Sequence, residues 1–315
     1  MINRRDFLKS ASLLTLGSAL VGKASAGNLM GSSNSSVSGV NAAKEIGLQT
    51  YSLGREFFSD VPGALKKVKG MGYTHLELAG YKDSKIGGVD LMEFKKMVAD
   101  SGLKITSSHV NPPVREYTKE NRSQIMEYWK KTADDHAKLG VKYLIQPGQP
   151  STRSVEEVAY VCEIFNEAGK IVKAAGIPFG YHNHEMEFAK VVPGGTESKF
   201  GRRVREGEVI YDLFLKQTDP ALVFFEMDVY WTVMGQNDPV EYMQKHKDRI
   251  KVLHIKDRAV LGQSGMMNFE MIFKQMYANG IADYFVELEK MPDGRTQFEG
   301  VKGCADYLLN ASFVK

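Results

Sequence analysis

Short apolar segments alternate with longer amphipathic segments from about residue 45 to the end of the chain. The short segments have the length and composition of buried strands, and the longer ones repeat apolar residues at the helical period. The predicted strands cover 46–51, 75–78, 104–109, 143–146, 178–182, 222–228, 250–255 and 284–287. The predicted helices cover 61–71, 91–101, 122–139, 155–175, 209–217, 239–245, 269–279 and 301–309.

Glycine follows several of these helices, at the position where a left-handed residue commonly ends a helix. The residues concerned are Gly72, Gly102, Gly140, Gly176 and Gly280. Eight strand–helix units at this spacing predict an α/β protein, a (β/α)8 TIM barrel that forms a single domain over residues 45–315. A dinucleotide-binding sheet has little support, because no GxGxxG sequence follows the first strand.

One segment, 190–208, interrupts the alternation and is rich in glycine and charged residues. It follows the fifth predicted strand, and in a barrel the loops after the strands lie on the catalytic face. Two interpretations stay open from the sequence: a lid over the site, or an insertion on the surface.

The composition is that of an ordinary soluble protein, with 43% hydrophobic and 25% charged residues. The formal net charge of +3 is small and is partly carried by basic residues near the N-terminus, so it gives no argument for a nucleic-acid partner. The two cysteines, Cys162 and Cys304, lie in apolar helical patterns. We expect buried free thiols at both positions rather than a disulfide.

The N-terminus has the features of an export signal. Arg4 and Arg5 precede an apolar run over 11–21, which is followed by the small residues Ala24-Ser25-Ala26. The run is too short to cross a bilayer, and the paired arginines followed by Phe-Leu-Lys resemble a twin-arginine signal. We therefore expect a signal peptide over 1–26, a flexible tether over 27–44, and a periplasmic protein without membrane attachment after cleavage.

Polar residues mark the ends of nearly all the predicted strands, which converge on one face of a parallel barrel. They are Tyr51, Glu77, His109, Gln146, His182, Asn183, His184, Glu185, Asp228, His254, Lys256, Asp257, Glu287 and Glu289. Imidazole and carboxylate groups together predict a site for one divalent metal ion, and they suit Mn²⁺, Zn²⁺, Fe²⁺ or Co²⁺ better than Ca²⁺ or Mg²⁺ held by oxygen alone. We favour Mn²⁺ and keep the other transition metals and Mg²⁺ as alternatives.

Four segments carry a family resemblance: Gly-Tyr-His-Asn-His-Glu-Met-Glu-Phe at 180–188, Phe-Glu-Met-Asp-Val-Tyr-Trp at 225–231, Leu-His-Ile-Lys-Asp at 253–257 and Phe-Val-Glu at 285–287. In their order and spacing they resemble the signatures of xylose-isomerase-like sugar phosphate isomerase/epimerase barrels. The resemblance extends from about residue 46 to the C-terminus.

This resemblance implies a metal held by Glu, Asp, His and Glu from strands five to eight. Asp228, His254 and Glu287 match the last three ligands. The first position holds His182 where the family has Glu, and His184, Glu185 and Glu187 lie close by in the sequence. We take His182 as the first ligand and leave the neighbouring residues open as alternatives.

The resemblance also implies a sugar substrate and proton transfer beside a carbonyl group. Glu287 would be shared by metal and substrate, with Glu77, His109, His182 or His184 as proton carriers. The expected substrate contacts are Tyr51, Gln146, Asn183, Glu185, Trp231 and Lys256, whereas Glu289 is expected to be a solvated acid at the rim. 

The predicted activity is that of a metal-dependent sugar isomerase or epimerase that acts on an unphosphorylated or modified sugar through an enediolate. The alternatives are a 3-keto-glycoside lyase or hydrolase working by β-elimination, and a non-catalytic sugar-binding barrel. A nuclease of this fold is disfavoured, because it would need more metal ligands and a basic groove. Homo-oligomer formation is left open.

Overall fold

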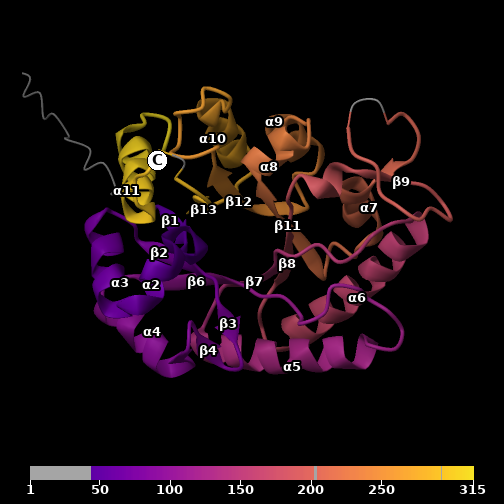
Figure 1. The fold of residues 1–315 in the computed structure, drawn as a ribbon, viewed down its shortest axis with the longest axis horizontal. Helices are drawn as coiled ribbons and strands as arrows, with labels where there is room; N and C mark the ends of the chain where they lie inside the picture. The colour runs from indigo at the N-terminus through magenta and orange to yellow at the C-terminus, as the bar shows by residue number, and fades with distance from the viewer. Residues whose placement is uncertain (1–43, 202–203, 292) are drawn as a thin grey trace, which may run out of the picture. The chain divides into compact units, whose positions relative to one another are not determined.

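A closed barrel of eight parallel strands forms the centre of the protein, in the order β1-β13-β12-β11-β8-β7-β6-β2 (Figure 1). The strands are β1 (Gly47–Gln49), β2 (His75–Leu78), β6 (Lys104–His109), β7 (Tyr143–Gln146), β8 (Phe179–His182), β11 (Val223–Asp228), β12 (Ile250–Lys256) and β13 (Asp283–Glu287). The predicted TIM barrel is confirmed. This computed structural model describes residues 44–201, 204–291 and 293–315, so the predicted signal peptide and nearly all of the tether lie outside the described residues.

Helices cover the outside of the barrel (Figure 1). They are α2 (Gly54–Ser59), α3 (Val61–Gly70), α4 (Leu91–Asp100), α5 (Arg122–Leu139), α6 (Val155–Ala174), α7 (Ile210–Gln217), α8 (Val229–Met234), α9 (Pro239–Lys245), α10 (Phe269–Ala278) and α11 (Gln297–Asn310). Within the described part of the chain, no helix has both the length and the hydropathy that a membrane crossing requires.

Most element boundaries agree with the sequence prediction, and two differ for local reasons. The first strand ends at Gln49 instead of residue 51, because the Gln49 side chain accepts a hydrogen bond from the backbone N–H of Tyr51 and starts a 3-10 turn, η1 (Thr50–Leu53). Helix α11 starts four residues before the predicted one, because Thr296 and Glu299 form a reciprocal capping box at its N-terminus.

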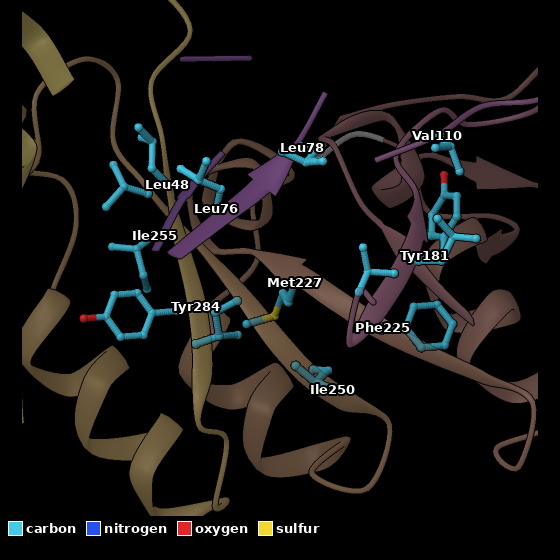
Figure 2. Packing of buried hydrophobic residues seen from close by; sticks show 14 of the residues in the cluster. Leu48, Leu76, Leu78, Val110, Tyr181, Phe225, Met227, Ile250, Ile255 and Tyr284 are labelled. Carbon is cyan, nitrogen blue, oxygen red and sulfur yellow. The ribbon is translucent and has the colours of Figure 1, made fainter. Parts of the chain in front are cut away.

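Alternate strand positions face opposite sides of the barrel wall. Leu48, Leu76, Phe225 and Met227 belong to the main hydrophobic core (Figure 2). A second, separate apolar cluster comprises Ile145, Phe224, Val252 and Phe285 from alternate positions of four strands. We call this second cluster the apolar floor, because its residues precede the polar strand ends and fill the barrel below them.

Gly180 in β8 makes room for the apolar floor. A Cβ atom at this position would lie 2.5 Å from Cζ of Phe224, far closer than two carbon atoms can approach. The absence of a side chain on β8 therefore allows the Phe224 ring of the neighbouring strand to fill the barrel interior.

The two ends of the segment 190–208 pair as a two-stranded antiparallel sheet, formed by β9 (Lys190–Val191) and β10 (Glu208–Val209). Its backbone is also tied to the start of α6, where the N–H of Val155 donates to the carbonyl of Val192. A second small sheet, missed by the sequence prediction, contains β3 (Tyr81–Lys82), β4 (Lys85–Ile86) and β5 (Val89–Asp90). Cys162 and Cys304 are buried and free, as predicted.

Candidate active site

Two overlapping groups of imidazoles and carboxylates lie inside the barrel, directly above the apolar floor. The outer cluster comprises His182, Asp228, His254 and Glu287, and the deep cluster comprises His109, His182, Glu226 and His254. In each cluster the four donor atoms all lie within 4.8 Å of one another. The structure therefore brings the four sequence-predicted metal ligands together, and it adds a second set that shares two of them.

In the deep cluster, three imidazole rings surround one carboxylate oxygen. Glu226 Oε2 lies 2.7 Å from Nε2 of His109, 3.2 Å from Nδ1 of His182 and 3.3 Å from Nε2 of His254. All four side chains are buried to at least nine-tenths of their surface. The rings of His109 and His254 are stacked, with their centroids 5.0 Å apart.

Glu77 supports the deep cluster from the side of β2. Its carboxylate accepts hydrogen bonds from the Gln49 amide at 2.9 Å and the Ser107 hydroxyl at 2.6 Å, and its Oε2 lies 2.5 Å from Nε2 of His254. The strand pairing shifts register immediately before Glu77 and again immediately before Glu226. Such irregularities change the direction of a strand and of the side chains that follow it, and here both precede a buried acid.

The pKa values of Glu77 and Glu226 are shifted in opposite directions. Burial would raise the pKa of Glu77, but His109 and His254 outweigh it and hold that pKa below its ordinary value. Burial, together with the charge of Glu77, raises the pKa of Glu226 to about 7. Burial and the neighbouring His254 hold the pKa of His182 well below its usual range, which favours the neutral imidazole, the form that offers a lone pair.

The outer cluster lies at the C-terminal ends of β8, β11, β12 and β13. Asp228 caps α8, where its Oδ1 accepts from the backbone N–H of Trp231 at 2.9 Å, and its buried Oδ2 has no hydrogen-bond partner. Glu287 Oε2 lies 3.2 Å from Nδ1 of His254 and accepts from Nζ of Lys256 at 3.0 Å. Burial raises the pKa of Asp228 to about 7, whereas Lys256 overcomes burial at Glu287 and keeps that pKa well below its ordinary value.

Lys256 is buried at the edge of the outer cluster. Besides Glu287, it donates to Glu289 at 2.6 Å and lies 3.8 Å from Oδ2 of Asp228. Its ammonium group also lies 4.6 Å from the ring centroid of Trp231. Glu289, expected to be a solvated acid at the rim, is 34% exposed and also pairs with this lysine.

The remaining predicted substrate contacts lie around the mouth of the barrel. Gln146 and His184 line a cavity of about 510 Å³ formed by the loops that follow β6 and β7. Tyr51 is 59% exposed, and Glu185 is half-buried. Asn183 is buried and its Oδ1 accepts from the backbone N–H of Asp228, so its amide supports the outer cluster directly.

Comparison with known proteins identifies the family. A family model for the xylose isomerase-like TIM barrel matches residues 65–303. The chain belongs to this family. The family predicted from the sequence is thus confirmed.

Two solved structures similar to this xylose isomerase-like barrel come from Parabacteroides distasonis ATCC 8503, and both are described as sugar phosphate isomerase/epimerases. One is 64% identical, covers 86% of this chain and 100% of that chain, and has a TM-score of 0.81. The other is 50% identical, covers 89% of this chain and 100% of that chain, and has a TM-score of 0.83. These matches confirm the expected class of enzyme, a sugar isomerase or epimerase.

A more limited similarity connects the chain to inosose dehydratases. The protein from Halalkalibacterium halodurans is 33% identical over 97 residues, which cover 31% of this chain. The match spans only 27% of the length of that dehydratase.

The outer cluster of this xylose isomerase-like barrel fits a divalent metal ion. Its two imidazoles and two carboxylates are the donor types that transition metals prefer, and the orphaned Oδ2 of Asp228 offers an unused acceptor. Glu185, Glu187 and His184 belong to neither cluster. Glu187 instead accepts from the Tyr181 hydroxyl and the backbone N–H of His184, so His182 fits the first ligand position best.

Glu226 is the main residue that sequence reasoning missed. It lies two positions before Asp228 in β11, and residues two apart face the same side of a strand. That spacing was the available signal for placing Glu226 on the same face as Asp228. Glu226 forms the centre of the deep cluster, while the predicted candidates Glu77 and His109 surround it.

Proposed function

We propose that the protein is a metal-dependent sugar isomerase or epimerase that acts on an unphosphorylated or modified sugar. The observation that carries this proposal is the outer cluster, where metal-type donors lie beside buried proton-carrying groups at the mouth of the barrel. The relatives named as sugar phosphate isomerase/epimerases support the same class of reaction.

The proposed cofactor is one divalent ion, Mn²⁺ in the first instance, held by His182, Asp228, His254 and Glu287. When bound there, such an ion supplies polarisation of a sugar carbonyl or hydroxyl oxygen. The buried position of all four side chains excludes bulk water, which strengthens charge interactions at the site.

The side chains around the outer cluster then perform the proton transfers. Glu287 is placed to remove the proton from the carbon next to the carbonyl, which yields an enediolate. The Lys256 ammonium stabilises the negative charge that develops on the sugar oxygen, and His184 at the mouth returns a proton to the neighbouring carbon or oxygen. Glu77 and His109 lie deeper and act through His254, whose orientation they fix.

A lyase or hydrolase acting on 3-keto-glycosides is the second candidate. Two observations favour it: the partial similarity to inosose dehydratases, and the cavity beside His184 that could hold a leaving group. The first step is the same proton abstraction, after which the bond β to the carbanion breaks. Product analysis separates the two functions, because only elimination yields an unsaturated sugar or a released aglycone.

Solvent deuterium tests the proposed chemistry. When the enzyme, Mn²⁺ and a panel of free sugars, keto-glycosides and sugar phosphates are incubated in D₂O, NMR should show deuterium on the carbon α to the carbonyl of an unphosphorylated sugar. Turnover of sugar phosphates alone would contradict the proposed substrate class. Turnover without exchange would leave two accounts, shielded return of the proton or a hydride shift, and full activity of a Glu287→Gln variant would exclude the first of them.

The preference for unphosphorylated sugars rests on the proposed export of the protein. Phosphosugars are mainly cytoplasmic, so an exported enzyme meets free and oligomeric sugars instead. Replacing Arg4 and Arg5 with lysine should leave the protein in the cytoplasm, because the twin-arginine pathway reads the arginine pair. Cell fractionation checks this prediction, and unchanged export of the variant would overturn the twin-arginine assignment.

A further inference from the structure

The deep cluster is a complete donor set of its own. We propose that His109, His182, Glu226 and His254 form a second binding site for a divalent transition-metal cation, of the Zn²⁺ or Co²⁺ type. This site shares His182 and His254 with the outer cluster, on which the proposed function rests, and differs from it in His109 and Glu226. Three nitrogen donors and one carboxylate favour a smaller, borderline-soft cation, whereas the outer cluster has equal numbers of nitrogen and oxygen donors.

The spacing of the donor atoms supports this proposal. A tetrahedral cation with bonds of about 2.0–2.1 Å separates its donor atoms by about 3.3 Å. Glu226 Oε2 lies 3.2 Å from the His182 nitrogen and 3.3 Å from the His254 nitrogen. The shorter contact of 2.7 Å to His109 is a hydrogen bond that a small movement of either side chain would open.

An unpartnered atom provides a second and independent observation. Nδ1 of His182, which faces the cluster, has no hydrogen-bond partner, although the side chain is almost completely buried. Buried polar atoms normally find a partner, and each one left without it is costly. A cation among the four donors would give this nitrogen a partner, and Glu226 would hold the cation through Oε2, the oxygen that faces the three imidazoles.

Charge balance points in the same direction. Oε2 of Glu77 lies 3.1 Å from the same His109 nitrogen that faces Glu226, so two carboxylates border the centre of the cluster. A dication there would be neutralised by these two acids. Glu77 is itself fixed by Gln49 and Ser107, a supporting arrangement of the kind that orients metal-binding imidazoles.

His254 shows how the deep and outer sites are arranged. Its Nε2 faces Glu77 and Glu226 of the deep side, while its Nδ1 faces Glu287 of the outer cluster. Substitutions of Asp228 and Glu287 therefore remove outer donors without touching the deep set. Substitution of Glu226 removes a deep donor and leaves the outer set complete.

Cobalt binding to variants of the full chain tests the proposal. In the variant that combines Asp228→Asn with Glu287→Gln, chelator-treated protein given Co²⁺ should retain about one ion per chain after gel filtration and show the strong visible absorption of four-coordinate Co²⁺. Adding Glu226→Gln should weaken Co²⁺ binding by at least about tenfold. Adding Glu289→Gln instead, a change outside both clusters, should leave Co²⁺ binding unaltered.

Two results would overturn the deep site. One is complete loss of Co²⁺ from the Asp228→Asn/Glu287→Gln variant while circular dichroism shows an intact barrel. The other, which does not require the triple variant to fold, is an X-ray absorption spectrum of Co²⁺ in the double variant with fewer than three imidazole ligands. Either outcome leaves the proposed sugar chemistry at the outer cluster intact, because that is tested with Mn²⁺ and substrate.

Discussion

Replacing Asp228 with alanine should remove bound Mn²⁺ and catalytic activity together while the barrel still folds. Asp228 supplies one of two carboxylates in the outer cluster, so we expect activity to fall at least about 100-fold. The fold should tolerate the change, because the loss of the Asp228 cap on α8 costs about 1 kcal/mol and a buried carboxyl is removed at the same time. Metal analysis after equilibration with Mn²⁺ and an activity assay check the prediction.

Asp238→Ala is the matched control for this experiment. Asp238 caps α9 as Asp228 caps α8, with its Oδ1 accepting from the backbone N–H of Val240 at 2.7 Å, but it belongs to neither cluster. This variant should lose a similar amount of stability and keep its Mn²⁺. An Asp228→Ala protein with unchanged Mn²⁺ content would show that the metal assignment is wrong.

Replacing Glu287 with glutamine should abolish turnover almost completely, with a loss of at least about 100-fold in kcat. The amide has nearly the same shape as the carboxylate but cannot accept a proton from carbon. The substitution also removes the negative charge that faces Nδ1 of His254 and Nζ of Lys256. Kinetics on the substrate found in the D₂O experiment, with Mn²⁺ content measured in parallel, provide the test.

Glu289→Gln is the control, because Glu289 pairs with the same lysine at 2.6 Å but lies outside both clusters. Its effect on kcat should be small compared with that of Glu287→Gln. Full activity in Glu287→Gln would exclude the proposed mechanism, including the variant in which the proton returns without solvent exchange. With full activity in Glu287→Gln, a hydride shift would remain possible only if the Glu287 carboxylate did not help to hold the metal.

Much of the fold could be predicted from the sequence because local signals agreed with one another. The strands at 75–78, 104–109 and 143–146 have the predicted boundaries, since each lies a few residues after a glycine that ends a helix. The rule that strand ends converge then placed Asp228, His254 and Glu287 on one face, as the structure shows.

The part that could not be predicted depends on strand register and on contacts between distant segments. The register shift before Glu226 has no local sequence signal. The position of Glu226 among three histidines was therefore not predicted. Lys256 was expected to contact substrate, yet whether its charge reaches Asp228, Glu287 or Glu289 depends on the pairing of β11, β12 and β13. Such pairings are set by tertiary packing, which a single sequence does not display.

The apolar floor of Ile145, Phe224, Val252 and Phe285 has a kinetic consequence. It separates the deep cluster from the opposite end of the barrel, where a cavity of about 610 Å³ opens beneath Tyr143 and Phe224. A hydrogen taken from a substrate can therefore reach bulk water only through the mouth that the substrate itself occupies. Exchange with solvent at the mouth therefore competes with return of the hydrogen to the sugar, so the fraction of deuterium in the product reports how often the hydrogen escaped before the sugar left.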